Sequence, residues 1–181
     1  SGRHDGPHET HHRTLGLRRL DAFDDGQYLD QFNPATYTNS NGVTPWTTPW
    51  TETSDLGGNI VTGGQIRIAG NQLVFRDDDN EAGAGTATIQ RGVNLLGATS
   101  ATISYAYDEN NFDAGEILTV VFSRDGTALE TVQTLNSNSG EGTHSFNLTG
   151  PFTANAFVRF VVSGTNNNSG GGDNIEINDL A

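Results

Sequence analysis

The chain lacks several residue types, and each absence narrows what the protein can be. Its 181 residues include no cysteine and no methionine, and all nine basic residues are arginine. Without cysteine there is neither a disulfide framework nor thiolate chemistry. Proline is scarce, at 5 residues, and no apolar run approaches the length of a membrane-spanning helix. We therefore expect no direct insertion into a membrane.

Positive charge is also scarce, because the formal net charge is −13. The first 20 residues carry a net charge of +2, so the remainder carries −15. A surface of this sign repels phosphate backbones, which excludes nucleic acid as a partner. It suits Ca²⁺, which binds hard oxygen ligands. An acidic, cysteine-free composition rich in Gly, Asn and Thr is typical of secreted or cell-surface bacterial modules that calcium stabilises in place of disulfides.

The pattern of apolar residues predicts an all-β fold. Short strand-like runs recur between turn residues, no segment has a sustained helical period, and the chain contains 23 glycines. The expected strands lie within residues 64–75, 86–95, 99–107, 117–123, 128–135, 143–148, 157–162 and 175–177. A further hairpin is expected at 37–42, where Asn41 precedes Gly42. This pattern is typical of a sandwich or a barrel.

We expect the chain to consist of a polar leader and one folded domain. Residues 1–19 are polar and read as a leader or linker, whereas residues 20–181 form one domain. The leader contains the H-E-x-x-H pattern of zinc peptidases between His8 and His12. No apolar helix surrounds it, so a solvated linker is the favoured interpretation and adventitious Zn or Ni binding the alternative.

Carboxylates at two distant positions predict a calcium site. Asp24 and Asp25 follow an apolar residue near the start of the domain, and Asp173 and Asn174 precede the last strand. Together they offer Ca²⁺ the oxygen ligands that it prefers. The alternative is that Asp25 belongs only to a turn. The acidic run 77–81 is a second candidate, for which a hydrated loop is the simpler interpretation.

Aromatic and amide side chains suggest a ligand-binding surface. Trp46 and Trp50 would share one face of a strand and could stack on a sugar ring, unless one or both belong to the core or to a lid over it. Tyr107, Asp108 and Asn110 combine an aromatic face with hydrogen-bonding groups that suit sugar hydroxyls, although such residues are also common in loops.

These segments, in this order, carry a resemblance to a known family. FDDG, YTNSNGVTPWTTPWTE, QIRIAGNQLVF, TATIQRGVNLLGATSATISYAY, GEILTVVFSRDG and VRFVVSG…GDNIEI resemble bacterial MAM-like, galactose-binding-like modules of extracellular enzymes and of cadherin-like or adhesin-type surface proteins. The resemblance implies a jelly-roll β-sandwich of two antiparallel sheets. It also implies a metal, usually calcium, between Asp24 and Asp173. The MAM cysteines are missing here, which fits a bacterial branch.

The sequence is compatible with three functions. The favoured one is a non-catalytic, monomeric module that binds carbohydrate or another cell-surface ligand. The second is a structural spacer of a surface protein, in contact with neighbouring domains. An enzyme is disfavoured, because His144 is the one histidine of residues 20–181 and no G-x-S-x-G motif occurs, although a paired-carboxylate glycosidase or lyase is compatible with the composition.

Overall fold

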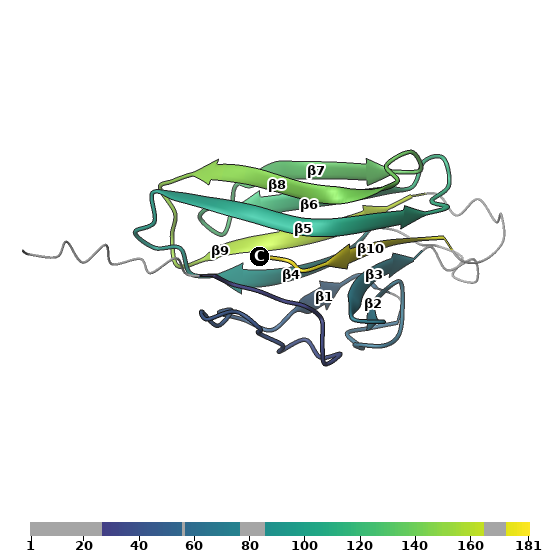
Figure 1. Cartoon of the computed structure of the whole chain (residues 1–181), viewed down its shortest axis with the longest axis horizontal. Coiled ribbons are helices and arrows are strands. Elements are labelled where there is room, and N and C mark those ends of the chain that lie inside the picture. Colours follow the sequence, from purple (N-terminus) through teal and green to yellow (C-terminus); the bar gives the residue numbers. More distant parts are fainter. Residues whose placement is uncertain (1–26, 56, 77–85, 165–172) are drawn as a thin grey trace, which may run out of the picture.

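The computed structural model describes residues 27–55, 57–76, 86–164 and 173–181. Within these ranges the regular secondary structure consists of strands, which form two five-stranded antiparallel sheets. The sheets pack as two layers of a sandwich (Figure 1), so the predicted jelly-roll fold is confirmed. The same ranges contain no helix that is long and apolar enough to cross a membrane.

Strands that follow one another along the chain often belong to opposite sheets. One sheet has the order β1 (Thr51–Thr53), β4 (Ala87–Val93), β9 (Ala156–Ser163), β6 (Ile117–Ser123) and β7 (Leu129–Asn136). The other has the order β2 (Ile66–Ala69), β3 (Gln72–Arg76), β10 (Asn174–Asn178), β5 (Ser100–Asn110) and β8 (Glu141–Thr149). The chain therefore crosses between the layers at the ends of the sandwich, where loops from both sheets meet.

The expected hairpin at residues 37–42 is wrong, because this segment forms no strand. Its backbone bonds instead to distant segments: the amide of Trp50 donates to the Tyr37 carbonyl (2.9 Å), and the amide of Asn41 donates to the Leu29 carbonyl (2.8 Å). Gly42 is needed for packing and not for a hairpin turn, since a Cβ there would lie 2.1 Å from the carbonyl oxygen of Gln27.

The core forms where alternate residues of each strand point between the sheets. On β9 the inward side chains include Phe160, which is fully buried. Its ring centroid lies 5.5 Å from that of Phe75, 6.0 Å from that of Trp50 and 6.2 Å from that of Tyr105. Phe160 thus joins its own sheet to β3 and β5 of the other sheet and to the loop that precedes β1.

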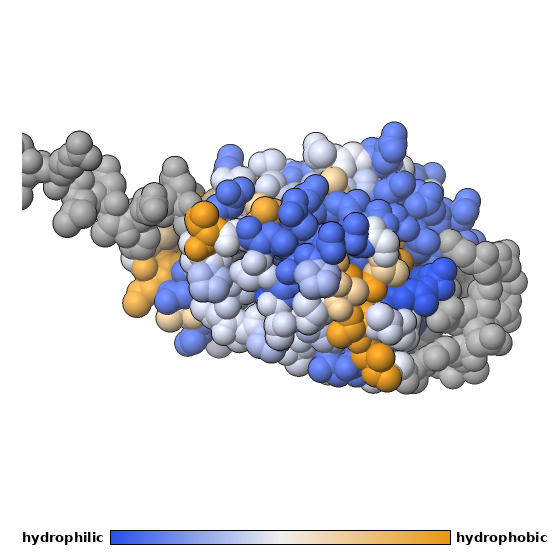
Figure 2. All heavy atoms as spheres, turned by 60° about the horizontal axis from the view of Figure 1, so that its bottom comes forward, coloured by the Kyte–Doolittle hydropathy of each residue, from blue (hydrophilic) through white to orange (hydrophobic). Residues whose placement is uncertain are grey.

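The face shown in Figure 2 is largely hydrophilic, with only small apolar patches.

The first described segment is fastened to the end of the chain. Asp30 pairs with Leu180 as an isolated antiparallel bridge. The Asp30 amide donates to the Leu180 carbonyl (2.8 Å), and the Leu180 amide donates to the Asp30 carbonyl (3.1 Å). The bridge brings the Asp30 side chain between the layers, where it is 0% exposed.

A buried ion pair holds the same segment to β4. Arg91 is 2% exposed, and its guanidinium bonds to Oδ2 of Asp30. Oδ2 also accepts from the indole N–H of Trp50 (2.7 Å), Oδ1 accepts from the side-chain amide of Asn39 (3.2 Å), and Arg91 Nε donates to the Thr48 carbonyl (3.0 Å). Both charges are therefore compensated by partners inside the protein. Burial lowers the pKa of Arg91 to about 10, against the opposing effect of Asp30, so the guanidinium stays charged at neutral pH.

Removing one member of this pair should be costly. We expect Arg91→Met to lower the free energy of unfolding by about 3–5 kcal/mol, because Asp30 is left as an uncompensated buried charge. The double variant Asp30→Asn/Arg91→Met should recover part of that loss. Urea unfolding at pH 7 measures both. Arg159→Met is the control, since Arg159 bonds to Gln90 (2.9 and 2.6 Å) on the outer face of the same sheet. An equal loss in Arg91→Met and Arg159→Met would contradict a special role for the buried pair.

Candidate functional site

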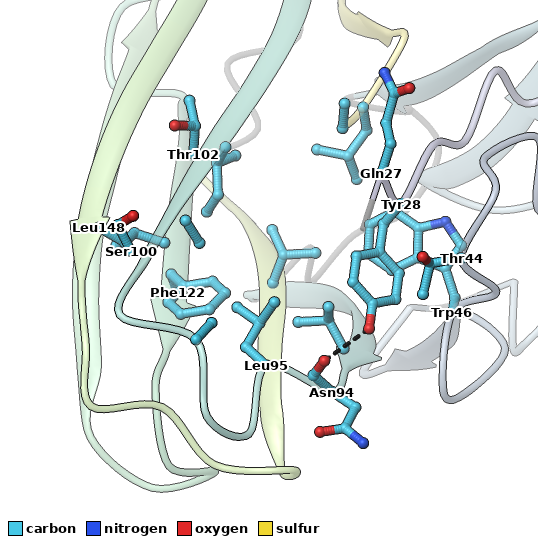
Figure 3. A pocket seen from close by; sticks show the side chains of 17 residues that line it. Gln27, Tyr28, Thr44, Trp46, Asn94, Leu95, Ser100, Thr102, Phe122 and Leu148 are labelled. Carbon is cyan, nitrogen blue, oxygen red and sulfur yellow. Dashed lines mark hydrogen bonds between the residues drawn. The ribbon is translucent and has the colours of Figure 1, made fainter. Parts of the chain in front are cut away.

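A cavity of about 690 Å³ lies at the end of the sandwich where β5 begins. Its walls come from the segment before β1, from the β4–β5 connection, from both sheets and from the last two residues. Figure 3 shows Tyr28 and Trp46 on one side of this hollow and Ser100, Phe122 and Leu148 on the opposite side. A volume of this size is within the range of small-molecule sites in proteins.

An aromatic pair forms one wall. The ring centroids of Tyr28 and Trp46 are 5.4 Å apart, and the rings are tilted by 52°. The Tyr28 hydroxyl donates to the Asn94 carbonyl (2.7 Å), which links this wall to the β4–β5 connection (Figure 3). The guanidinium of Arg91 lies over Trp46, at 4.9 Å from the ring centroid. Contacts on both aromatic side chains therefore fix the wall in place.

Neutral polar groups accompany the aromatic wall. The described lining includes amides and hydroxyls from five residues but no carboxylate, guanidinium or imidazole side chain: Gln27, Thr44, Asn94, Ser100 and Thr102. Amides and hydroxyls both donate and accept hydrogen bonds, so they can match the hydroxyl groups of an uncharged ligand. Sequence reasoning missed these residues, because each is an ordinary loop or strand-edge residue with no local motif.

The structure separates the two predicted tryptophans. Trp46 lines the cavity, whereas Trp50 is 1% exposed and packs in the core against Phe32 and Phe160. The expectation of a platform made by both indoles is corrected accordingly, because Trp50 presents no accessible face. The residues from 46 to 50 do not form a strand, so the shared face on which that expectation rested does not exist.

The second group of predicted ligand residues lies elsewhere. Asp108 is six residues further along β5 than Thr102, which corresponds to about 20 Å of extended strand. Tyr107 is half-buried against the core, and Asn110 donates to the side chain of Asn174 (3.4 Å). The structure therefore does not bring these residues together with Trp46.

Only some of the predicted metal ligands lie within the described residues. Asp24, Asp25, the acidic run 77–81 and the histidines of the leader lie outside the described residues. Asp173 is 9% exposed and directly precedes β10, whose first residue is Asn174. Among the described residues, no group of three or more His, Cys, Asp or Glu side chains could hold a metal ion.

A carboxyl pair that the sequence analysis did not identify consists of Glu52 on β1 and Asp55 just after it. Glu52 is 8% exposed, and its Oε1 accepts a hydrogen bond from the Tyr37 hydroxyl. Its Oε2 is buried and has no hydrogen-bond partner in the described structure. The neighbouring Asp55 accepts from the backbone amide of Gln65 (2.9 Å). Burial raises the pKa of Glu52 to about 7, the Tyr37 hydrogen bond opposes this rise, and the Asp55 charge adds to it.

Comparisons with known proteins identify similar folds. No protein-family model and no curated protein matches the sequence. Among solved structures, the carbohydrate-binding module TmCBM61 in complex with β-1,4-galactotriose is 13% identical, with a TM-score of 0.49, covering 83% of this chain and 92% of that one. The C-terminal family 22 carbohydrate-binding module of Clostridium thermocellum Xyn10B is 15% identical (TM-score 0.47, 86% and 91% covered). The K2 adhesin domain of Lys-gingipain is 17% identical (TM-score 0.42, 72% and 87% covered). These likenesses concern the fold alone.

The raised pKa of Glu52 predicts a pH-dependent stability. A group whose pKa is higher in the folded state contributes stability below its unfolded pKa and loses that contribution as the pH rises through the folded value. The contribution of Glu52 should therefore be complete below pH 4.5 and lost as the pH rises through about 7. We expect Glu52→Gln to be more stable than the parent by about 3 kcal/mol at pH 8 and of similar stability at pH 4.5.

Urea unfolding of both proteins across this pH range checks the prediction. Glu141→Gln, at an exposed position of β8, is the matched control and should follow the parent at every pH. Parallel profiles for the parent and Glu52→Gln would show that burial of Glu52 does not control its ionisation.

Proposed function

We propose that this domain is a non-catalytic carbohydrate-binding module that holds a sugar residue against the Tyr28–Trp46 wall. The observation that carries the proposal is the combination of this aromatic pair with neutral amides and hydroxyls around one cavity. An aromatic face packs against the C–H groups of a pyranose ring, and the polar groups bond to its hydroxyls. Fold similarity alone would not support a function.

The chemistry of the lining favours binding without catalysis. The side chains that commonly act as general acid, general base or nucleophile in sugar hydrolysis are carboxylates. The described cavity lining offers none. We place the module at a cell surface or in the extracellular medium, because its composition is typical of surface domains that calcium stabilises. The competing function is a structural spacer, which the burial of Trp50 favours because one of the two predicted stacking residues is a core residue.

Replacing Trp46 should separate these functions. We expect Trp46→Ala to weaken the binding of a neutral glycan by at least about tenfold, equivalent to about 1.4 kcal/mol, because the stacking face is lost. Trp46→Phe, which keeps an aromatic face, should lose less. A glycan array with the parent identifies the sugar, and isothermal titration calorimetry gives the affinities.

Asp108→Asn is the control, because this residue lies on the same strand as the cavity but at its other end. Loss of binding in Asp108→Asn with normal binding in Trp46→Ala would move the site to the far end of β5. A parent that binds no glycan on the array would favour the spacer function.

Calcium remains part of the proposal, with Asp173 and Asn174 as the predicted ligands that lie within the described residues. We expect Asp173→Ala to weaken calcium binding and to lower the melting temperature in calcium but not in EDTA, because a carboxylate ligand contributes only when the ion is present. Thermal unfolding in the two buffers measures this difference. Equal losses in both would show that Asp173 acts through local hydrogen bonds.

A further inference from the structure

The cavity has two ends of different chemistry. The aromatic wall and the neutral polar side chains, including Ser100 beside Leu148 (Figure 3), are exposed or half-buried and form the mouth, whereas the inner end is formed by buried, inward-facing residues of both sheets. Ile103 and Leu148 come from β5 and β8, and Phe122 and Val158 come from β6 and β9. Each of these four side chains is at least nine-tenths buried. The inner end is therefore a branch of the hydrophobic core.

A bare sugar does not suit this inner end. The side chains of Ile103, Leu148, Phe122 and Val158 have no hydrogen-bonding groups, so sugar hydroxyls placed among them would be left unpaired, which is unfavourable. An alkyl group placed there would gain by leaving water. The whole cavity, at about 690 Å³, is several times the roughly 150 Å³ of an apolar cavity that holds one benzene ring, so it has room for a sugar and an alkyl group together.

The mouth of the cavity is also compatible with an apolar group. Val43 is 81% exposed and Leu96 is 62% exposed, and each adjoins a lining residue in the sequence, Thr44 and Leu95 respectively. The described lining has no charged side chain, and the chain as a whole carries a net charge of −13. An anionic substituent is thus disfavoured, and a neutral one is admitted.

We propose that the cavity binds a sugar that carries an uncharged alkyl or acyl chain. The sugar lies at the Tyr28–Trp46 wall, and its alkyl or acyl chain lies between the two sheets. This inference rests on the proposed carbohydrate-binding function and names the ligand class of the same site.

The test compares matched probes on the full chain by isothermal titration calorimetry. The probes are methyl and n-octyl β-glycosides of glucose and galactose, with the octyl glycosides kept below their critical micelle concentrations, and octan-1-ol. We expect the octyl glycoside to bind at least tenfold more tightly than the methyl glycoside of the same sugar, and more tightly than octanol.

Two substitutions on β5 test where the alkyl chain of the ligand binds. Ala101 pairs with Leu148 and lines the cavity, so Ala101→Phe should fill the inner end and abolish the advantage of the octyl glycoside over the methyl glycoside. Ala101→Leu, a smaller filling, is measured beside it and should reduce the advantage. Ala106→Phe is the matched control, because Ala106 lies on the opposite face of the same strand from Ile103 and should leave the advantage intact.

The possible results distinguish failure of this inference from failure of the proposed function. Equal affinities for methyl and octyl glycosides would overturn the inference and leave sugar binding in place. Equal affinities for octanol and the octyl glycosides would show that the sugar contributes nothing, which overturns both. Absence of binding to every probe would overturn the inference, and the glycan array then decides the proposed function separately.

Discussion

The buried ion pair between Asp30 and Arg91 is the interaction on which the arrangement of this domain depends. Residues 27–50 contain no strand, so they cannot be held by a continuous ladder of backbone bonds. They are held instead by the bridge to Leu180 and by single hydrogen bonds to neighbouring segments. In the centre of these contacts, the two oxygens of the Asp30 carboxylate accept from a backbone amide, a side-chain amide, an indole N–H and a guanidinium on β4. Two charges removed from water are tolerated only when such partners surround them. The pair therefore specifies where the segment lies more than it adds net stability.

The same guanidinium links the core to the cavity. Its carbon lies 4.9 Å from the ring centroid of Trp46 and 5.6 Å from that of Trp50. Trp46 is thereby held between Arg91 and Tyr28, and Tyr28 is itself fastened through its hydroxyl to Asn94. A wall fixed in this way before a ligand arrives loses little side-chain freedom on binding. The fold thus provides a preorganised surface from a segment that has no regular secondary structure.

Much of the fold could be predicted, because most strands carry their own signal. The dense apolar run of β9 and the alternation of β2 and β3 identify strands without knowledge of their partners. The alternation of buried residues along β4 contains a further signal. Ala87, Ile89 and Val93 share one face, and Arg91 lies in the same phase, which places a charge inside the sandwich. A buried arginine requires a carboxylate partner, but the sequence alone does not identify which of 22 acidic residues supplies it.

The candidate site was less predictable, because its residues are brought together by loop paths and not by local pattern. The spacing of Trp46 and Trp50 implied a common face only if the residues between them were extended, and they are not. Tyr107, Asp108 and Asn110 have the right chemistry for a sugar but stand at the opposite end of β5 from the cavity. The hydrogen bond from Tyr28 to Asn94, which joins two sides of the cavity, spans 66 residues of sequence. Short-range patterns determine which face of a strand is buried, whereas long-range polar contacts of this kind determine which loops meet. A binding site made at the end of a sandwich depends on the second kind of information, and composition can indicate its chemistry but not its position.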